Sequence, residues 1–341
     1  MTDNHPSLAM APDARRLVEF FSRSVTSFQS SGEPMRILCT LPHANDGQPA
    51  SRRPGAAATV QRLIVLDSSF NPPTRAHAQM ARSAVREAVE SGSRTRLMLL
   101  LAVNNADKAP KPASFPLRLC MMDAFATTLL QGPDDAGSNV DGGLEIDLAV
   151  TTRPYFHDKA RAVAATGFYD GEDGEGRPRQ VFLAGFDTLV RIFDAKYYAS
   201  EHDGRAGGRA GGRAASGMQA ALGPFFDLAS LRITTRPDDS WGGLAQQHAY
   251  VRQLARRLED AGGRAAWASR VELVDGHADA DEAGSGGNTG ARAATGISSS
   301  QVRALVRLGS GEEELDGLVD GEVRRWIELE GLYREGEGDG T

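Results

Sequence analysis

The run FNPPTRAH places a threonine, an arginine and a histidine directly after two prolines. Thr74 is a suitable N-cap and the prolines end any earlier element, so a helix is expected to begin at Thr74. The free N–H groups at a helix start bind anions, and His77 in the first turn would add a directed donor to a phosphate. The spacing alone leaves open an ordinary capped helix with an exposed His77.

The run GISSSQVRALVR, near the other end of the chain, has the same character. Ser298 and Gln301 fit the capping box Ser-x-x-Gln, in which each residue satisfies a backbone N–H group of the other. Arg303 and Arg307 lie four residues apart on a face that differs from the apolar one. The segment therefore combines hydroxyl groups, helix N–H groups and an arginine one turn in, which suits a polyphosphate. The alternative is an ordinary capped amphipathic helix.

Buried strands and helices alternate along the chain between these two runs. Near-continuous apolar runs such as RLIVLD are typical of strands that are buried on both faces. Their alternation with helical segments predicts a parallel α/β sheet with crossover helices. The expected strands are 35–41, 62–67, 96–103, 144–150, 180–185, 231–235 and 270–275, and the expected helices are 13–28, 74–90, 115–130, 186–194, 244–260, 299–308 and 320–330.

Segments rich in glycine, aspartate or arginine interrupt this alternation, most clearly GRAGGRAGGRA within 203–217. Such tracts can bind RNA, but their composition buries too little apolar surface to offset the entropy of ordering. We interpret them as disordered surface insertions. The expected organisation is an N-terminal extension at 1–60 (helix, short strand and loop), a domain at 61–333 with insertions near 133–143, 170–179, 200–220 and 276–296, and a disordered tail at 334–341.

The 341 residues carry 38 lysines and arginines against 45 aspartates and glutamates, a net charge of −7. This balance excludes a generally basic protein that coats nucleic acid. No run reaches about 18 apolar residues, which excludes a transmembrane helix. Cys39 and Cys120 are too few for a disulfide scaffold or a cysteine-only zinc site, and they fit a reducing compartment. Because the N-terminus does not resemble a secretory signal, we expect a location in the cytoplasm or nucleus.

The two helix-start runs together resemble the nucleotidyltransferase superfamily. FNPPTRAH is similar to its nucleotide-binding loop, which has His or Thr, two residues, then His, here Thr74 and His77. ISSSQVR is similar to its second motif, Ile-Ser-Ser-Thr-x-x-Arg, with Ser300 in the threonine position. The resemblance implies a Rossmann-like, doubly wound parallel sheet that binds ATP across the two helix starts. The ATP-binding residues that it implies are Ser68, Ser69, Phe70, Thr74, His77, Ile297, Ser298, Ser299, Ser300 and Arg303.

Three further segments resemble the nicotinamide mononucleotide adenylyltransferases, and their fungal-type branch in particular. They are the opening LDSSFNPPT, the element VFLAGFDTLVRIFDAKYY with its Gly-x-Asp, and the closing VRRWIELEGLY. The resemblance covers about 61–333 apart from the insertions. The loop departs from the family, because Ser68 and Ser69 stand in a stretch where members commonly have glycine, and Ala76 stands where many have Gly or Met. The two serines can donate hydroxyl groups there instead.

The activity that the resemblance implies is ATP-dependent adenylyl transfer to nicotinamide mononucleotide, giving NAD and pyrophosphate. His77 and Arg303 are then the catalytic residues, which stabilise charge on the phosphates. Mg²⁺ is expected to enter with ATP and to be held mainly by ATP oxygens, so no metal site of the protein itself is expected. The expected substrate-binding residues are Lys108, Gly185, Asp187, Arg236 and Trp241.

Several of these residues have a simpler alternative. Lys108 and Lys111 can be solvated loop charges, Asp187 a plain N-cap and Trp241 a surface aromatic, while Arg118 is a further candidate for a phosphate. The same fold could also serve an ATP-binding or ATP-hydrolysing regulatory protein, or an adenylyltransferase for nicotinate mononucleotide or phosphopantetheine. An RNA-binding scaffold is the non-enzymatic alternative. The expected partners are ATP and nicotinamide mononucleotide, with neither a membrane nor a specific nucleic acid.

Overall fold

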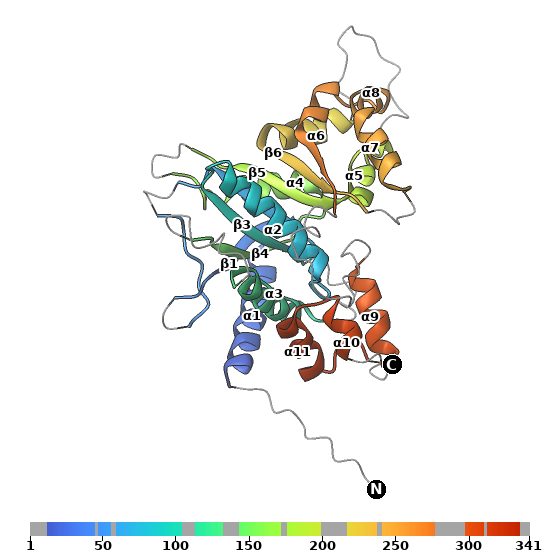
Figure 1. Cartoon of the computed structure of the whole chain (residues 1–341). Coiled ribbons are helices and arrows are strands. Elements are labelled where there is room, and N and C mark those ends of the chain that lie inside the picture. Colours follow the sequence, from blue (N-terminus) through green and yellow to red (C-terminus); the bar gives the residue numbers. More distant parts are fainter. Residues whose placement is uncertain are drawn as a thin grey trace.

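Seven strands of the described residues form one sheet at the centre of the computed structural model (Figure 1). The structure describes residues 12–44, 47–55, 59–103, 113–131, 143–171, 176–198, 217–236, 241–276, 297–309 and 312–334. The strands are β1 (Met35–Leu41), β2 (Arg62–Asp67), β3 (Thr95–Ala102), β4 (Ile146–Thr151), β5 (Arg179–Gly185), β6 (Ala229–Thr234) and β7 (Val271–Val274). Their order in the sheet is β1-β4-β3-β2-β5-β6-β7.

The order β4-β3-β2-β5-β6-β7 is that of a doubly wound Rossmann sheet, in which the chain starts at the centre and builds outward on one side and then on the other. All neighbours within this order pair in parallel. The predicted fold class is therefore confirmed. In such sheets ligands bind at the carboxyl ends of the strands where the winding reverses, which here lies between β2 and β5.

β1 departs from the predicted parallel sheet, because it pairs antiparallel with β4 at one edge. Its apolar run MRILCTL correctly predicted a strand, but apolar periodicity carries no information on the partner or direction of that strand. β1 precedes the winding unit and is added beside β4, so the crossover connection that makes the other strands parallel does not apply to it.

Helices cover both faces of the sheet. They are α1 (Pro12–Ser31), α2 (Arg75–Glu90), α3 (Phe115–Leu130), α4 (Phe156–Ala165), α5 (Phe186–Ile192), α6 (Gly217–Leu228), α7 (Leu244–Arg252), α8 (Leu254–Asp260), α9 (Ser299–Arg307), α10 (Glu312–Asp316) and α11 (Gly321–Leu329). The core that contains Ile64 includes residues of α1, α2, α3 and α11, and the core that contains Val65 includes residues of α4, α5, α6 and α8. Crossover helices thus bury both faces, as a parallel sheet requires. None of the described helices is long and apolar enough to cross a membrane.

Two crossover helices escaped the sequence analysis. α4 has only ten residues, and α6 begins at Gly217 and contains Pro224, both of which weaken a helical pattern. The helix expected at 244–260 is divided at Gln253 into α7 and α8. Two expected insertions end sooner than predicted, because β5 begins at Arg179 and α6 at Gly217. Most residues of the expected insertions and of the expected tail lie outside the described part of the chain, so their interpretation stays a prediction. These residues are 132–142, 172–175, 199–216, 277–296 and those from 335 onward.

The two described residues that flank 199–216, Tyr198 and Gly217, lie next to each other. A side chain at Gly217 would overlap the carbonyl oxygen of Tyr198, so the two flanking residues touch. Deleting residues 203–214 is therefore expected to leave ATP affinity and the thermal unfolding midpoint unchanged. A loss of ATP affinity of about tenfold or more, about 1.4 kcal/mol by calorimetry, would contradict the insertion interpretation. Loss of RNA binding alone would instead favour the scaffold alternative.

Candidate active site

The loop between β2 and α2 turns sharply at the carboxyl edge of the sheet. Phe70 has a φ of 44°, which is uncommon for a residue with a side chain, and the peptide bond between Asn71 and Pro72 is cis. Phe70 is fully buried, and its ring centroid lies 5.6 Å from that of His77. Thr74 is the N-cap of α2, as predicted. The buried phenyl ring therefore anchors the one left-handed residue of this loop.

His77 is fixed at both ring nitrogens. Nδ1 accepts a hydrogen bond from the backbone N–H of Thr74 at 3.1 Å and lies 2.8 Å from the Thr74 hydroxyl group. Since Nδ1 accepts, the proton of the neutral ring is on Nε2, which lies 2.9 Å from the Ser68 hydroxyl group. Burial, followed by the positive charge of Arg236, lowers the pKa of His77 to about 4. His77 is thus a neutral donor through Nε2 at neutral pH and not an exposed first-turn residue.

The low pKa of His77 makes the stability of the fold depend on pH. The unfolded chain takes up a proton near the ordinary pKa of 6.5, whereas the folded protein resists protonation down to about 4. The unfolded state then binds more protons between these values, so the free energy of unfolding is expected to fall as the pH is lowered from 6.5 to 4. The loss is up to about 3 kcal/mol, at about 1.4 kcal/mol per pKa unit. Urea unfolding of the wild type and of His77→Gln between pH 6.5 and 4 tests this prediction. If the free energy of unfolding changed equally with pH in both proteins, His77 would not be the cause.

The start of α9 is bonded directly to the β2–α2 loop. Ser299 donates from its hydroxyl group to the Pro72 carbonyl oxygen at 2.8 Å, and Arg303 donates from Nη1 to the Asn71 carbonyl oxygen at 2.8 Å. The hydroxyl group of Tyr333 donates to the side-chain oxygen of Asn71 at 2.8 Å. The structure therefore brings together the two motifs that the sequence analysis singled out at opposite ends of the α/β region.

Three arginines near this loop have no carboxylate partner among the described residues: Arg118, Arg236 and Arg303. Arg118 is buried at the start of α3, and its Nε donates to the Ala113 carbonyl oxygen at 2.8 Å. Burial, together with the like charge of Arg303, lowers the pKa of Arg118, while Tyr333 opposes that shift. Positive charge without a counter-charge favours an anion at this place.

The end of β5 adds a second group of polar side chains. Gly185 is the N-cap of α5, and a Cβ atom there would lie 2.8 Å from a carboxylate oxygen of Asp187 and 3.3 Å from Nε of Arg236. Asp187 also accepts from Arg191 at 2.9 Å, one turn along α5. The absence of a side chain at Gly185 therefore lets the Asp187 carboxylate and the Arg236 guanidinium approach the same point.

Gly185→Ala is expected to displace these two groups without unfolding the protein. The backbone of Gly185 has φ −80° and ψ 163°, which alanine adopts without strain. We expect a KM for the acceptor that rises about tenfold, or 1.4 kcal/mol, with little change in the thermal midpoint. Gly223→Ala in α6 is the matched control, because nothing lies within 4 Å of a Cβ atom there. An unchanged KM in Gly185→Ala would remove this position from the acceptor site.

The remaining candidates differ in their surroundings. The Ser300 hydroxyl group accepts from Nη2 of Arg303 at 3.0 Å. Trp241 is 43% exposed. Ser69 and Ser300 are exposed, whereas Ile297 is buried. Lys108 lies outside the described residues, together with Lys111. The binding roles given to these residues stay predictions.

Sequence reasoning missed polar and aromatic residues contributed by α4. Lys159 donates to the Asp67 carboxylate at the end of β2 at 2.5 Å, and burial raises the pKa of Asp67 although the Lys159 charge and hydrogen bond oppose the rise. At the start of the same helix, the exposed ring of Tyr155 stacks on His157 with centroids 5.5 Å apart. Asp67 directly precedes Ser68 in the sequence, but its partner could not be found because α4 was not predicted.

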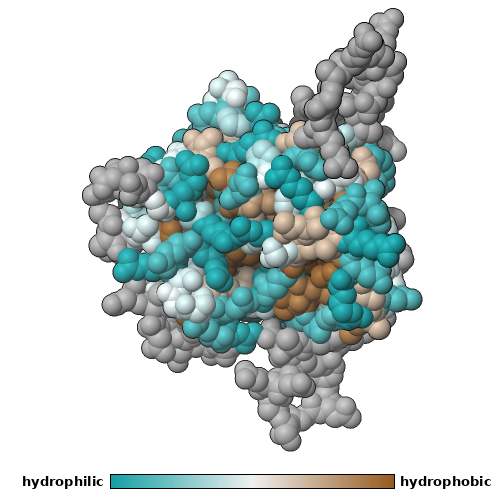
Figure 2. All heavy atoms as spheres, turned by 90° about the horizontal axis from the view of Figure 1, so that it is seen from above, coloured by the Kyte–Doolittle hydropathy of each residue, from teal (hydrophilic) through white to brown (hydrophobic). Residues whose placement is uncertain are grey.

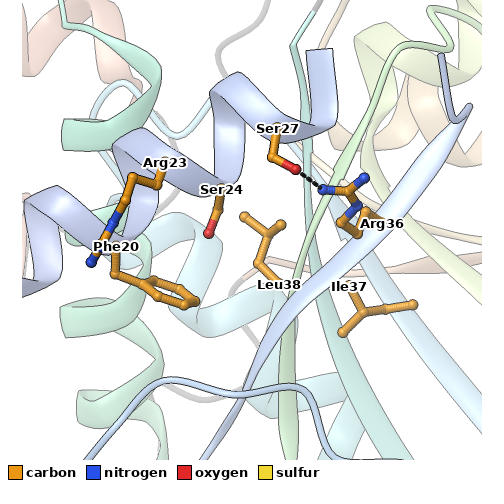
Figure 3. Close-up of a pocket in the computed structure, with 7 residues that line it drawn as sticks. All are labelled: Phe20, Arg23, Ser24, Ser27, Arg36, Ile37 and Leu38. Carbon is orange, nitrogen blue, oxygen red and sulfur yellow. Dashed lines mark hydrogen bonds between the residues drawn. The ribbon is translucent and has the colours of Figure 1, made fainter. Parts of the chain in front are cut away.

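Two cavities in the described part of the structure lie away from this cluster. One of about 360 Å³ lies between α1 and the edge strand β1, among Phe20, Arg36 and Leu38 (Figure 3). The other, of about 530 Å³, is lined by the first residues of β2, β5, β6 and β7 and by α2. Seen from above, the described surface is mostly hydrophilic, with hydrophobic residues visible between hydrophilic ones (Figure 2). The candidate site is therefore defined by its hydrogen bonds and charges rather than by either cavity.

The chain is similar over nearly its full length to a protein of Schizosaccharomyces pombe described as "Putative nicotinamide mononucleotide adenylyltransferase". The two are 28% identical over 314 residues, which are 92% of this chain and 97% of the relative. The resemblance to the nicotinamide mononucleotide adenylyltransferase-like nucleotidyltransferases is thereby confirmed. No family model matches the chain.

Solved structures with some likeness include the Plasmodium falciparum nicotinic acid mononucleotide adenylyltransferase in two complexes. The complex with NaAD has a TM-score of 0.45 and 12% identity, covering 80% of this chain and 97% of that chain. The complex with APC has a TM-score of 0.44 and 11% identity, with the same coverage.

Proposed function

We propose that the chain transfers the adenylyl group of ATP to nicotinamide mononucleotide, giving NAD and pyrophosphate. The observation that carries the proposal is the contact between the two motifs, in which Ser299 and Arg303 bond to the loop that precedes His77. An oxygen of the acceptor's 5′-phosphate forms a bond to the α-phosphorus of ATP. The bond from that phosphorus to the oxygen bridging to the β-phosphorus breaks, and pyrophosphate leaves with the electron pair.

The residues of the site suit this reaction, because adenylyl transfer needs positioning and charge neutralisation more than a protein nucleophile. The N–H groups at the starts of α2 and α9 would donate to the polyphosphate. Nε2 of His77 and the guanidinium of Arg303 would stabilise the charge that develops on pyrophosphate. Arg118 and Arg236 add positive charge, and the charge of Arg236 acts on His77.

In the proposed reaction Mg²⁺ would enter the site bound to ATP. Among the described residues no group of three or more His, Cys, Asp or Glu side chains could hold a metal ion. The two carboxylates beside the site, Asp67 and Asp187, are each paired with a cation, Lys159 and Arg191. The described side chains therefore do not fit a metal of their own, and we derive no step through one. Magnesium would be held by the phosphate oxygens of ATP.

The acceptor is expected to lie at the end of β5. The Asp187 carboxylate can accept hydrogen bonds from a ribose or from a nicotinamide amide group. Arg236, which lies against Gly185, would attract a carboxylate and makes nicotinate mononucleotide the second candidate. We place nicotinamide mononucleotide first, because it is the substrate in the name of the S. pombe relative.

A substrate panel tests the proposal. Purified protein is incubated with magnesium and ATP, and with nicotinamide mononucleotide, nicotinate mononucleotide or phosphopantetheine. The dinucleotide product, pyrophosphate and inorganic phosphate are then measured separately. We expect NAD and pyrophosphate in equal amounts. Phosphate release without a dinucleotide would replace the proposal by an ATP-hydrolysing regulatory protein, and product from another acceptor alone would replace the substrate.

A further inference from the structure

The backbone ladder between β2 and β5 stops just before the candidate site. β2 pairs with β5 as far as Leu66, opposite Leu183. On the other side, the N–H of Ser68 still donates to the Leu100 carbonyl oxygen of β3 at 3.3 Å. The residues Asp67 and Ser68 therefore lie at the point where the winding reverses, and main-chain pairing holds them on one side.

Side-chain bonds from both faces of the sheet meet at these two residues. Asp67 accepts from Lys159 of α4 at 2.5 Å, and the Ser68 hydroxyl group lies 2.9 Å from Nε2 of His77 in α2. Successive residues of a strand point to opposite faces, and α4 and α2 cover opposite faces here. Residues 67–68 are thus bonded on one face of the sheet by α4 and on the other by α2, at the point where the pairing of β2 with β5 has ended.

The buried ion pair between Lys159 and Asp67 is not explained by a contribution to the free energy of unfolding. The side chains of Lys159 and Asp67 are 6% and 7% exposed. Removing two charges from water costs about as much as their attraction returns, and well-packed apolar replacements of such pairs are often neutral or stabilising. The same burial leaves almost no surface for a ligand to touch. A pair of this kind beside Ser68 acts on the site through the backbone that it holds.

We propose that Asp67 and Lys159 are positioning residues for His77. The pair fixes the backbone of Asp67 and Ser68, so that the Ser68 hydroxyl group meets Nε2 of His77 and keeps the imidazole in one orientation, while the Thr74 N–H holds the tautomer at Nδ1. The catalytic consequence rests on the proposed function. The structural consequence is independent of it, because the state of the His77 ring can be observed without ATP.

The test removes both charges while keeping the side-chain shapes, in Asp67→Asn combined with Lys159→Met. The matched control is Glu87→Gln combined with Arg232→Met, which cuts an ion pair that links α2 to β6. The ring of His77 is followed by its ¹⁵N resonances in the full chain, assigned by their absence in His77→Gln. We expect the Nε2 resonance to shift in the first double variant, because its contact with Ser68 changes, and to keep its wild-type value in the control. We also expect kcat to fall about tenfold or more there, with the KM for ATP nearly unchanged.

Unchanged His77 resonances in a folded double variant would overturn the proposal and leave the pair as an anchor for α4. If the double variant does not fold, Lys159→Met alone takes its place, because it removes the donor that holds Asp67, and burial raises the pKa of the Asp67 carboxyl group so that it can take up a proton. Unchanged resonances in that variant overturn the proposal equally. If the wild type makes no dinucleotide, the proposed function fails, while the resonances still decide whether the pair holds His77.

Discussion

Replacing His77 by asparagine is expected to lower kcat for dinucleotide formation by about 10²–10³-fold, or about 3–4 kcal/mol, as loss of one preorganised donor does in other active sites. The KM for ATP should change much less, because the donor acts mainly when charge develops on the leaving pyrophosphate. The amide of asparagine ends at the level of Nδ1. It can still accept from the N–H of Thr74, but it places no donor at Nε2.

His77→Gln is the matched variant for this prediction. Its longer amide reaches the level of Nε2, and glutamine is a usual partner in a capping box, so it should retain more turnover than asparagine. His77→Ala also loses the bond to Thr74 and is expected to lose about 1 kcal/mol of stability. Steady-state kinetics and thermal melts of the three variants separate these effects. Normal turnover in a folded His77→Asn would remove His77 from catalysis.

Arg303→Ala is expected to weaken ATP binding by about 10–100-fold, since a hydrogen bond to a charged group contributes about 1.5–3 kcal/mol. The guanidinium donates to the Asn71 carbonyl oxygen at 2.8 Å and to the Ser300 hydroxyl group at 3.0 Å. Its loss therefore removes a link between the two motifs and the group that we propose binds a phosphate. Arg303→Lys should recover only part of the affinity, because an ammonium group is a single point charge without a planar fork.

Arg307→Ala supplies the control, because Arg307 is exposed one turn further along α9. Its ATP affinity, measured by titration calorimetry, should equal that of the wild type. Full affinity in Arg303→Lys would show that only a positive charge is needed at this position. Full affinity in Arg303→Ala would place the phosphates elsewhere, with Arg118 as the nearest candidate on the described chain.

The starts of both binding helices could be predicted because a cap is a local feature. Ser298 accepts from the N–H of Gln301 at 3.2 Å, which is the N-cap half of the predicted capping box. Local sequence does not reveal a partner that is distant along the chain. Without the resemblance to a family, nothing in either run indicated that Ser299 and Arg303 would bond to the β2–α2 loop. Nor did the spacing of Thr74 and His77 show that the histidine ring would take the place of the usual Glu or Gln in a cap.

The strands could be predicted to within two residues because buried strands are continuous apolar runs. The direction of β1 could not, since a run of apolar residues is the same in either direction. α4 and α6 were missed because the first is short and the second contains Pro224. The omission of α4 hid Lys159, and with it the ion pair to Asp67. Secondary structure that is weak locally and stabilised by packing is where the sequence was least informative.

The loop before His77 is bonded to residues that the ribosome adds long after it. Ser299, Arg303 and Tyr333 lie 227, 232 and 262 positions beyond the loop residues that they bond. At about 5–20 residues per second, the loop emerges roughly 10–50 s before these partners exist. All seven described strands are already made once Val274 has been added. A nascent chain that has not reached residue 299 can thus assemble its sheet before this loop is anchored, and the proposed ATP site is complete only after synthesis has passed the last of these residues.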